Sequence, residues 1–164
     1  MTKQIKRFVL VITSTFFIFF LSMLIGCGGS VEPSLNLQQK DAKALQEGSP
    51  WGGVGNVEVL TSPSGVDFSE LLKLQVSFTT SGKDDWAPTF FDASGSDDFL
   101  SSENGTWYWT GSGTDVITLT NASVLELTSV DVADDEITFS FEVSPSGSGG
   151  RTTGIDGSYT VSLK

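Results

Sequence analysis

The chain has 164 residues, of which nine are basic and twenty acidic, and its formal net charge is −11. A protein this acidic is unsuited to nucleic acid, whose phosphates are neutralised by Lys and Arg. Histidine is absent, which excludes Ser-His-Asp and Cys-His nucleophile systems and the usual zinc sites. The single cysteine, Cys27, rules out an internal disulfide. Glycosidases act through two carboxylates, and the chain has paired acids at Asp84-Asp85 and Asp134-Asp135-Glu136. Adjacent acidic residues on turns far more often serve solubility, so we expect no enzymatic activity.

Residues 1–26 have the organisation of an export signal. Such a signal has a positively charged start, an apolar middle and a small residue before the cleavage point. The charged start contains Lys3, Lys6 and Arg7. The apolar run covers 8–25, and Gly26 follows it. We expect this leader to direct the remainder of the chain out of the cytoplasm.

The end of the leader indicates a lipid anchor. The sequence Leu24-Ile25-Gly26-Cys27 resembles the bacterial lipoprotein box, in which the leader is removed before the cysteine and that residue is acylated on its thiol and new amine. The resemblance implies a mature chain of residues 27–164 tethered to a membrane through Cys27. Six basic and twenty acidic residues would remain, a formal charge of −14.

The alternative is an uncleaved membrane helix. An apolar run of about 18 residues is at the short end of what crosses a bilayer, and the basic residues before it would also leave the remainder outside the cytoplasm. Gly28 follows the cysteine. Gram-negative lipoproteins retained at the inner membrane commonly carry Asp at that place. The resemblance thus implies the outer membrane, on its periplasmic face or at the cell surface.

The next segment, 27–47, is predicted to be a flexible tether that includes a short helix. Gly28-Gly29-Ser30 opens a polar stretch that reaches about Gln39. Ala42, Ala44 and Leu45 favour a helical turn over 38–46. Gly48-Ser49-Pro50 would end it. The folded domain is then expected over 48–164.

From Trp51 onward the hydrophobic period is two, the period of strands that bury one face. Alternating segments cover 57–59, 72–78, 107–109, 117–119, 137–143 and 159–163. Turn signals lie at 62–65, 81–84, 103–106, 111–113, 134–135 and 145–150. These patterns predict an all-β domain, an antiparallel meander of seven to nine strands. A single sheet would expose an apolar face, so the meander closes as a lipocalin-like β-barrel or, alternatively, forms a two-layer β-sandwich.

Four stretches are similar to lipocalin-like lipoproteins of Gram-negative bacteria. They are the Leu…Gly…Trp opening in 44–51, the strand 72–80, the Gly-Thr-Trp strand in 104–109, and the closing Arg…Gly…Gly-x-Tyr pattern in 150–161. In the last stretch Val161 stands where the pattern has Phe. The resemblance implies a fold and a location, and it carries over no catalytic residues.

Three tryptophans and one arginine are candidates for ligand binding. Trp107 and Trp109 point to the same side of one predicted strand, and Trp86 lies in a predicted loop. They could line a cavity or a sugar-stacking face, with Arg151 pairing with a ligand carboxylate. The alternatives are that tryptophan fills the core and that Arg151 bonds to a neighbouring acidic side chain or carbonyl. In its loop, Trp86 could instead meet a partner or cap a barrel mouth.

The stretch 92–103 imitates a twelve-residue calcium loop. Calcium takes six to eight oxygen ligands, including a bidentate carboxylate. The candidate ligands are Asp92, Ser94, Ser96, Asp98 and Glu103. Asp97 stands where such loops need Gly, and no flanking helices are predicted. The alternative is a solvated acidic loop. Beyond this possible Ca²⁺ we expect no cofactor.

Two functions fit these patterns. The first is a structural or protein-interaction module of the cell envelope, and the second is a small-ligand or glycan binding module. A packed barrel interior favours the first and a hollow one favours the second. The predicted inward residues are rich in Phe and Trp, which favours a packed interior.

Overall fold

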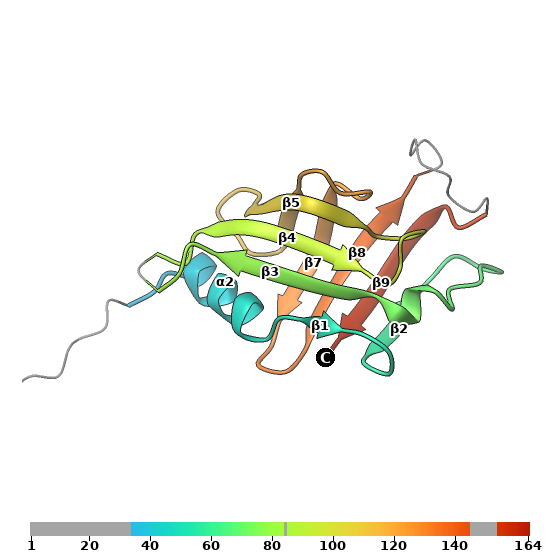
Figure 1. Cartoon of the computed structure of the whole chain (residues 1–164), viewed down its shortest axis with the longest axis horizontal. Coiled ribbons are helices and arrows are strands. Elements are labelled where there is room, and N and C mark those ends of the chain that lie inside the picture. The colour runs from blue at the N-terminus through green and yellow to red at the C-terminus, as the bar shows by residue number, and fades with distance from the viewer. Residues whose placement is uncertain (1–33, 84, 145–153) are drawn as a thin grey trace, which may run out of the picture. The chain divides into compact units, whose positions relative to one another are not determined.

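The computed structural model describes residues 34–83, 85–144 and 154–164. The predicted leader and the predicted anchor, Cys27, lie outside these residues. Residues 35–164 form one compact unit. Its elements are α2 (Leu37–Glu47), β1 (Trp51–Gly52), β2 (Val57–Thr61), the short 3-10 helix η1 (Leu71–Lys73), β3 (Gln75–Thr80), β4 (Pro88–Ser94), β5 (Ser102–Trp109), β6 (Val116–Leu119), β7 (Glu126–Val132), β8 (Ile137–Val143) and β9 (Gly157–Leu163) (Figure 1).

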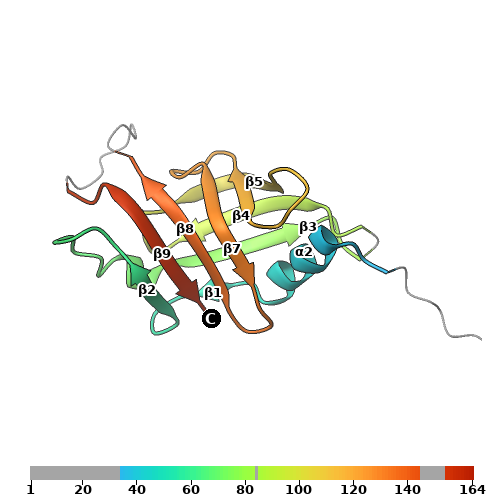
Figure 2. The ribbon, with the colours of Figure 1, turned by 180° about the vertical axis from the view of Figure 1, so that it is seen from behind.

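In this part of the chain nine antiparallel strands form one nearly closed, barrel-shaped sheet. The strand order is β1-β3-β4-β5-β6-β7-β8-β9-β2. From β3 to β9 each strand pairs with the next one along the chain, so the predicted antiparallel meander and all-β, lipocalin-like barrel are confirmed. Figures 1 and 2 show β3 and β4 on one side and β7, β8 and β9 on the other, with their strands crossing.

The barrel closes through the short segment that joins β1 to β2. β1 pairs with β3 and β2 pairs with β9, so the two ends of the strand order are consecutive in the chain. Gly52 N donates to Lys164 O at 2.9 Å, and Lys164 N donates to Asn56 O at 3.0 Å. Gly52 has a φ of 86°, and an added Cβ would lie 2.4 Å from Leu74 O. Only glycine suits this conformation and this approach.

The predicted turn over 103–106 is wrong, because these residues lie inside β5. Thr106 pairs with Phe90 of β4, and Tyr108 pairs with Thr118 of β6. Asn104 has a φ of 56°, and the register with β4 shifts nearby, between Phe91 and Ala93. The Asn-Gly sequence therefore marks an irregularity within the pairing of β5 with β4, ahead of Trp107, where the pairing with β6 begins. Asn tolerates the left-handed conformation within strands as well as in turns.

The predicted strand over 72–78 begins later than its alternation suggested. Leu71–Lys73 form a turn of 3-10 helix, and β3 starts at Gln75. Leu71 and Leu74 are fully buried, whereas Leu72 is exposed. The spacing of three between the buried leucines is that of a helical turn, in which the intervening residues face solvent.

A single cluster of buried side chains fills the barrel. Its largest fully buried members are Trp107, Tyr159, Phe78, Phe91, Phe99 and Phe139. Inward positions of β8 alternate with outward ones along the whole strand, as the period of two predicted. Val57 and Val59 of β2 are half-buried and pack against this cluster.

Helix α2 belongs to the folded unit. Asn36 and Gln39 form a capping box, in which each side chain accepts a hydrogen bond of 2.9 Å from the backbone N–H of the other residue. Ala42 and Leu45 are fully buried. The helical turn predicted over 38–46 is therefore present, and it packs on the barrel as a fixed part of the domain.

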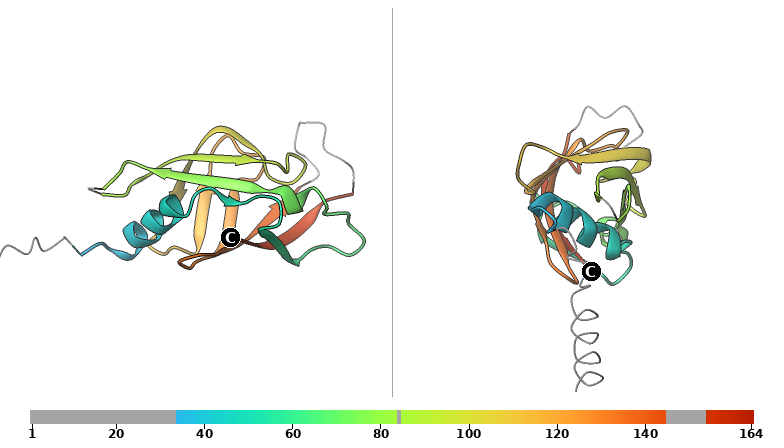
Figure 3. Two further views of the ribbon diagram at one scale, coloured as in Figure 1. Left: turned by 60° about the horizontal axis from the view of Figure 1, so that its bottom comes forward. Right: turned by 90° about the vertical axis from the view of Figure 1, so that its left-hand side faces the viewer.

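The helix lies across one end of the barrel (Figure 3). The side chain of Gln46 reaches β3, where its Oε1 accepts from Thr80 N at 2.7 Å and from Thr80 Oγ1 at 2.5 Å. Trp51 Nε1 donates to Leu45 O at 2.8 Å. Its ring covers Gly48, where an added Cβ would overlap the indole. The Leu…Gly…Trp opening is therefore a structural joint between helix and barrel.

Candidate functional site

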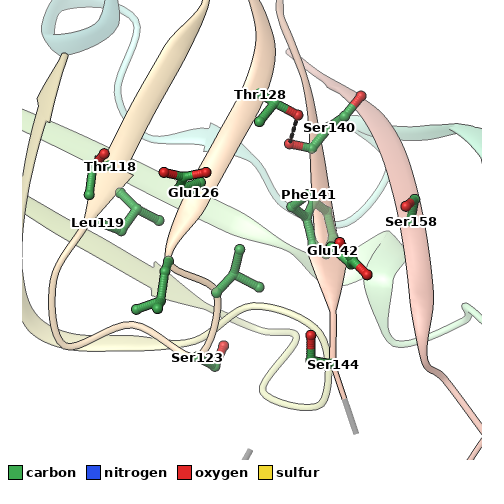
Figure 4. Close-up of a pocket in the computed structure, with 12 residues that line it drawn as sticks. Thr118, Leu119, Ser123, Glu126, Thr128, Ser140, Phe141, Glu142, Ser144 and Ser158 are labelled. Carbon is green, nitrogen blue, oxygen red and sulfur yellow. Dashed lines mark hydrogen bonds between the residues drawn. The ribbon is translucent and has the colours of Figure 1, made fainter. Parts of the chain in front are cut away.

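An open groove lies on the outer wall of the barrel, where β7 and β8 diverge. It has a volume of about 720 Å³, which lies within the usual range for ligand sites. Figure 4 shows the two strands separating beyond the bond from Thr128 Oγ1 to Ser140 O (3.4 Å). The groove is therefore a defect in the sheet itself, bordered by two strands.

The register explains where the strands separate. β7 and β8 pair from Val132↔Ile137 to Thr128↔Ser140. Their pairing ends there, although both strands continue. Two residues further along each strand stand Glu126 and Glu142, both exposed. Continued pairing would set these carboxylates directly opposite each other, and like charges opposite each other destabilise an antiparallel pair.

The groove has an apolar floor and a polar rim. The floor includes Leu119, Val124 and Phe141, all of which are buried. Leu125 also lines it and is 66% exposed. Hydroxyl groups come from Thr118, Ser123, Thr128, Ser140, Ser144 and Ser158. Its charged residues are Glu126 and Glu142, and no Lys or Arg is among its lining residues within the described chain. The groove therefore suits a neutral or cationic group.

The groove is held by backbone bonds around its rim. Leu119 N donates to Leu125 O at 2.8 Å, which extends the pairing of β6 with the start of β7. Ser123 N donates to Ser101 O at 2.9 Å, and Ser101 N donates to Ser123 Oγ at 2.8 Å. The loop beside the groove is thus fixed to the segment before β5.

The barrel interior, where a lipocalin-like ligand would sit, is lined by rings in mutual contact. The Phe78 ring lies 5.2 Å from both Phe91 and Trp107, and Trp107 lies 5.4 Å from Trp109. Near the opposite strands, Tyr159 lies 5.2 Å from Phe99 and 5.6 Å from Phe141. These separations and tilts are those of packed aromatic cores.

Trp107 and Trp109 belong to this packed interior. Trp107 Nε1 donates to Thr79 O at 2.9 Å, and Trp109 Nε1 donates to Gln38 O of α2 at 3.3 Å. Both indoles are buried. Their N–H groups are bonded within the protein, which is how buried tryptophans avoid the cost of an unpaired donor. Their predicted contact with a ligand stays a prediction.

Trp86 is buried although it lies in a loop. Its φ is 51°, and Lys43 of α2 lies over its ring with Nζ 5.6 Å from the centroid. The loop is ordered by Asp85, which accepts hydrogen bonds from the hydroxyl of Ser81 and from Ala87 N. Both hydrogen bonds lower the pKa of the Asp85 carboxyl, and the bond from Ser81 has the larger effect. Trp86 therefore packs between the loop and α2, at the end of the barrel that α2 covers.

Two predicted sites lie outside the described residues. Arg151 falls in the gap 145–153, and Cys27 falls before residue 34. The predicted turn over 145–150 falls in the same gap. The predictions that Arg151 binds a ligand and that Cys27 is acylated remain predictions.

The predicted calcium ligands do not share one loop. Asp92 and Ser94 lie in β4, and Glu103 lies in β5, so the ends of the stretch are in paired strands. Ser96 is buried, with a hydroxyl that finds no hydrogen-bond partner in the structure, whereas Asp92 is exposed. Asp98 is half-buried. Across the described ranges, no three acidic or cysteine side chains are placed to share a metal ion. Calcium binding stays a prediction.

Sequence reasoning did not identify the groove. The alternation over 137–143 identifies Glu142 as an outward residue of a strand. Because the strand β7 was not predicted, the position of Glu126 across the groove from Glu142 could not be foreseen. Among the described residues, no helix is both long and apolar enough to span a bilayer. Comparison of the chain with protein-family models, with curated proteins and with solved structures finds no match.

Proposed function

We propose that this protein is a lipid-anchored lipoprotein of the bacterial envelope, whose non-catalytic β-barrel serves as a structural or protein-interaction module. The observation that carries the proposal is the aromatic cluster inside the barrel. The ring of Phe78 on β3 contacts both Phe91 of β4 and Trp107 of β5. The ring of Tyr159 on β9 contacts both Phe99, in the segment before β5, and Phe141 of β8.

A packed interior moves recognition to the outside of the barrel. Ligand-binding barrels of this size hold one small molecule in a central void. Here large aromatic side chains are buried inside the barrel with their rings in contact, and α2 covers one end with Ala42 and Leu45 buried. Binding on the outer wall, at loops or at strand edges is how packed domains contact other proteins.

The lipid anchor is proposed from the sequence. Acylation of Cys27 with two or three chains holds a protein stably at a membrane, whereas one chain is marginal. The tether from Cys27 to the start of the folded unit at Leu35 is short, so the barrel would stay close to the outer membrane.

The anchor is tested by the variant Cys27→Ser and membrane fractionation. The unchanged protein should be processed and found with outer membranes. The variant should move to soluble or unprocessed fractions. A variant that stays in the membrane as a processed protein would remove the anchor from the proposal.

The interaction role is tested by affinity purification from detergent-solubilised envelopes after chemical cross-linking. A single protein recovered at a fixed ratio to the barrel supports the role. Recovery of the barrel with a small molecule bound, and without any protein at a fixed ratio, contradicts it.

The alternative is a small-ligand or glycan binding module. The groove between β7 and β8 favours it, because its volume of about 720 Å³ and its hydroxyl-rich rim suit an uncharged polar ligand. Titration with neutral oligosaccharides, followed by NMR of the labelled protein, would test it. Shifts confined to residues that line the groove support this alternative, and unchanged spectra contradict it.

A further inference from the structure

A strand edge is exposed within the sheet, beside the groove. β8 pairs with β9 as far as Val143↔Gly157, but its last registered pair with β7 is Ser140↔Thr128. Ser140 O accepts from Thr128 Oγ1, so the backbone groups of Ser140 face β7. Backbone groups two residues apart in a strand face the same way. The backbone N–H and C=O of Glu142 therefore face the groove. No described residue of β7 pairs with Glu142.

Such an edge is a template for another strand. An extended peptide can add to it through main-chain hydrogen bonds, while alternate side chains enter pockets or face solvent. The floor of the groove offers Leu119, Val124 and Phe141 to side chains that point inward. Leu125 at the rim is 66% exposed and offers a further apolar contact.

The charges select the other side chains of such a peptide. Glu126 and Glu142 border the groove on β7 and β8. Neither forms an ion pair within the described residues, where the two salt bridges are Lys43–Glu47 and Lys73–Glu70. Phosphates and acidic peptides are disfavoured here. Outward Lys or Arg side chains on an added strand would meet the two carboxylates.

We propose that the groove between β7 and β8 binds an extended segment of a partner protein in which basic and apolar residues alternate, and that this segment adds as a strand along β8. The inference rests on the proposed role as a protein-interaction module and names the partner chemistry and the surface. The opposed carboxylates keep β7 and β8 apart, and the incoming cations neutralise them.

The test uses the full chain purified in detergent and a fluorescently labelled peptide of alternating Lys and Val, with binding followed by anisotropy. Two matched probes accompany it. One replaces every Lys with Glu, and the other carries N-methyl groups on the backbone nitrogens that would face β8. The Lys–Val peptide should bind, and both matched probes should fail to bind.

Variants locate the binding on the protein. The double variant Glu126→Gln, Glu142→Gln should weaken binding about fivefold, since each exposed charge pair contributes modestly. The control Glu58→Gln, Asp131→Asn removes two exposed carboxylates from β2 and from the far end of β7, and it should leave binding unchanged. Leu125→Asn should weaken binding with no loss of folded structure, because the side chain is exposed.

Four results would overturn the inference. Equal binding of the N-methylated peptide would show that charge alone is recognised. Equal weakening by the control variant would place the effect in the net charge of the protein. Binding of chitohexaose in the groove, with no binding of the Lys–Val peptide, would assign the groove to glycans. If a partner is recovered from envelopes and still binds the groove variants, the interaction role stands and this surface is wrong.

Discussion

Glu126 and Glu142 occupy the two positions at which the pairing of β7 with β8 stops, each two residues beyond the pair Thr128↔Ser140. In a continued ladder their Cβ atoms would be about 5 Å apart. Because β7 and β8 separate here, the two carboxylates do not come this close, and the groove opens between the two strands (Figure 4). A local charge conflict in the sequence is thus coupled to a gap in the barrel wall.

Removing one of these charges should stabilise the fold. Glu142→Thr replaces a carboxylate with a β-branched residue that favours strand pairing, so the ladder can extend. We expect the free energy of unfolding, measured by urea denaturation with circular dichroism, to rise by about 0.5–1 kcal/mol. Glu58→Thr is the control, because Glu58 pairs with Ser162 and faces no opposed carboxylate there. Similar changes in both variants would contradict the role of the opposed pair.

The packed interior predicts a large cost for truncating a core ring. Trp107→Ala removes a side chain that is 1% exposed and contacts Phe78 and Trp109. Losses of about 3–5 kcal/mol are usual for such changes, which is a large part of the stability of a small domain. Tyr108→Ala, the next residue along β5, is 49% exposed and should cost much less. Equal urea midpoints for the two variants would indicate a hollow interior.

The joint between α2 and β3 should depend on Gln46. Its Oε1 accepts from Thr80 N and Thr80 Oγ1, so Gln46→Ala leaves a half-buried backbone donor without its partner. We expect a loss of about 1–3 kcal/mol in the free energy of unfolding. Lys40→Ala, at an exposed position of the same helix, should be close to neutral. A neutral Gln46→Ala would mean that α2 is not held by this bond.

The phenol of Tyr159 should lose its proton at a higher pH than an ordinary tyrosine does. Burial, and then the charge of Asp156, raise the pKa of its phenol above the ordinary value of 10.0, and its hydroxyl donates to Ile155 O at 2.5 Å. The folded state therefore keeps this proton at a pH where the unfolded chain has lost it. The resulting stabilisation is complete below the unfolded pKa and is lost as pH rises through the folded pKa.

The variant Tyr108→Phe allows a direct measurement, because the chain has two tyrosines and Tyr159 then titrates alone. Phenolate absorbance should rise with a midpoint above pH 10, together with a loss of native circular dichroism. A midpoint at or below pH 10 in a protein that remains folded would contradict burial of this hydroxyl.

The sequence predicted strands where alternation is unbroken. β8 has the bounds that its period of two indicated, since every inward position holds Ile, Phe or Val. β7 was missed because Ser129, with a φ of 50°, interrupts the alternation and the register shifts between Thr128 and Asp131. β4 was missed because it starts at Pro88 and holds adjacent rings, of which Phe90 faces solvent and Phe91 the core.

The groove depends on that same shift. If β7 continued without a bulge in the register of Asp131↔Thr138, Glu142 would stand opposite Leu127, and the two carboxylates would not meet. A one-residue bulge changes every later partner in a ladder, and the sequence around Ser129 carries no glycine or turn signal that marks it. The candidate surface could therefore be recognised only once the register was known.

The most direct measurement of the central claim is native mass spectrometry of the protein extracted from its membrane in mild detergent. We predict a chain that begins at an acylated Cys27, carries no small molecule within the barrel, and is bound to a protein partner. Detection of an unacylated chain, or of the barrel alone with a small molecule retained through extraction, would contradict the account.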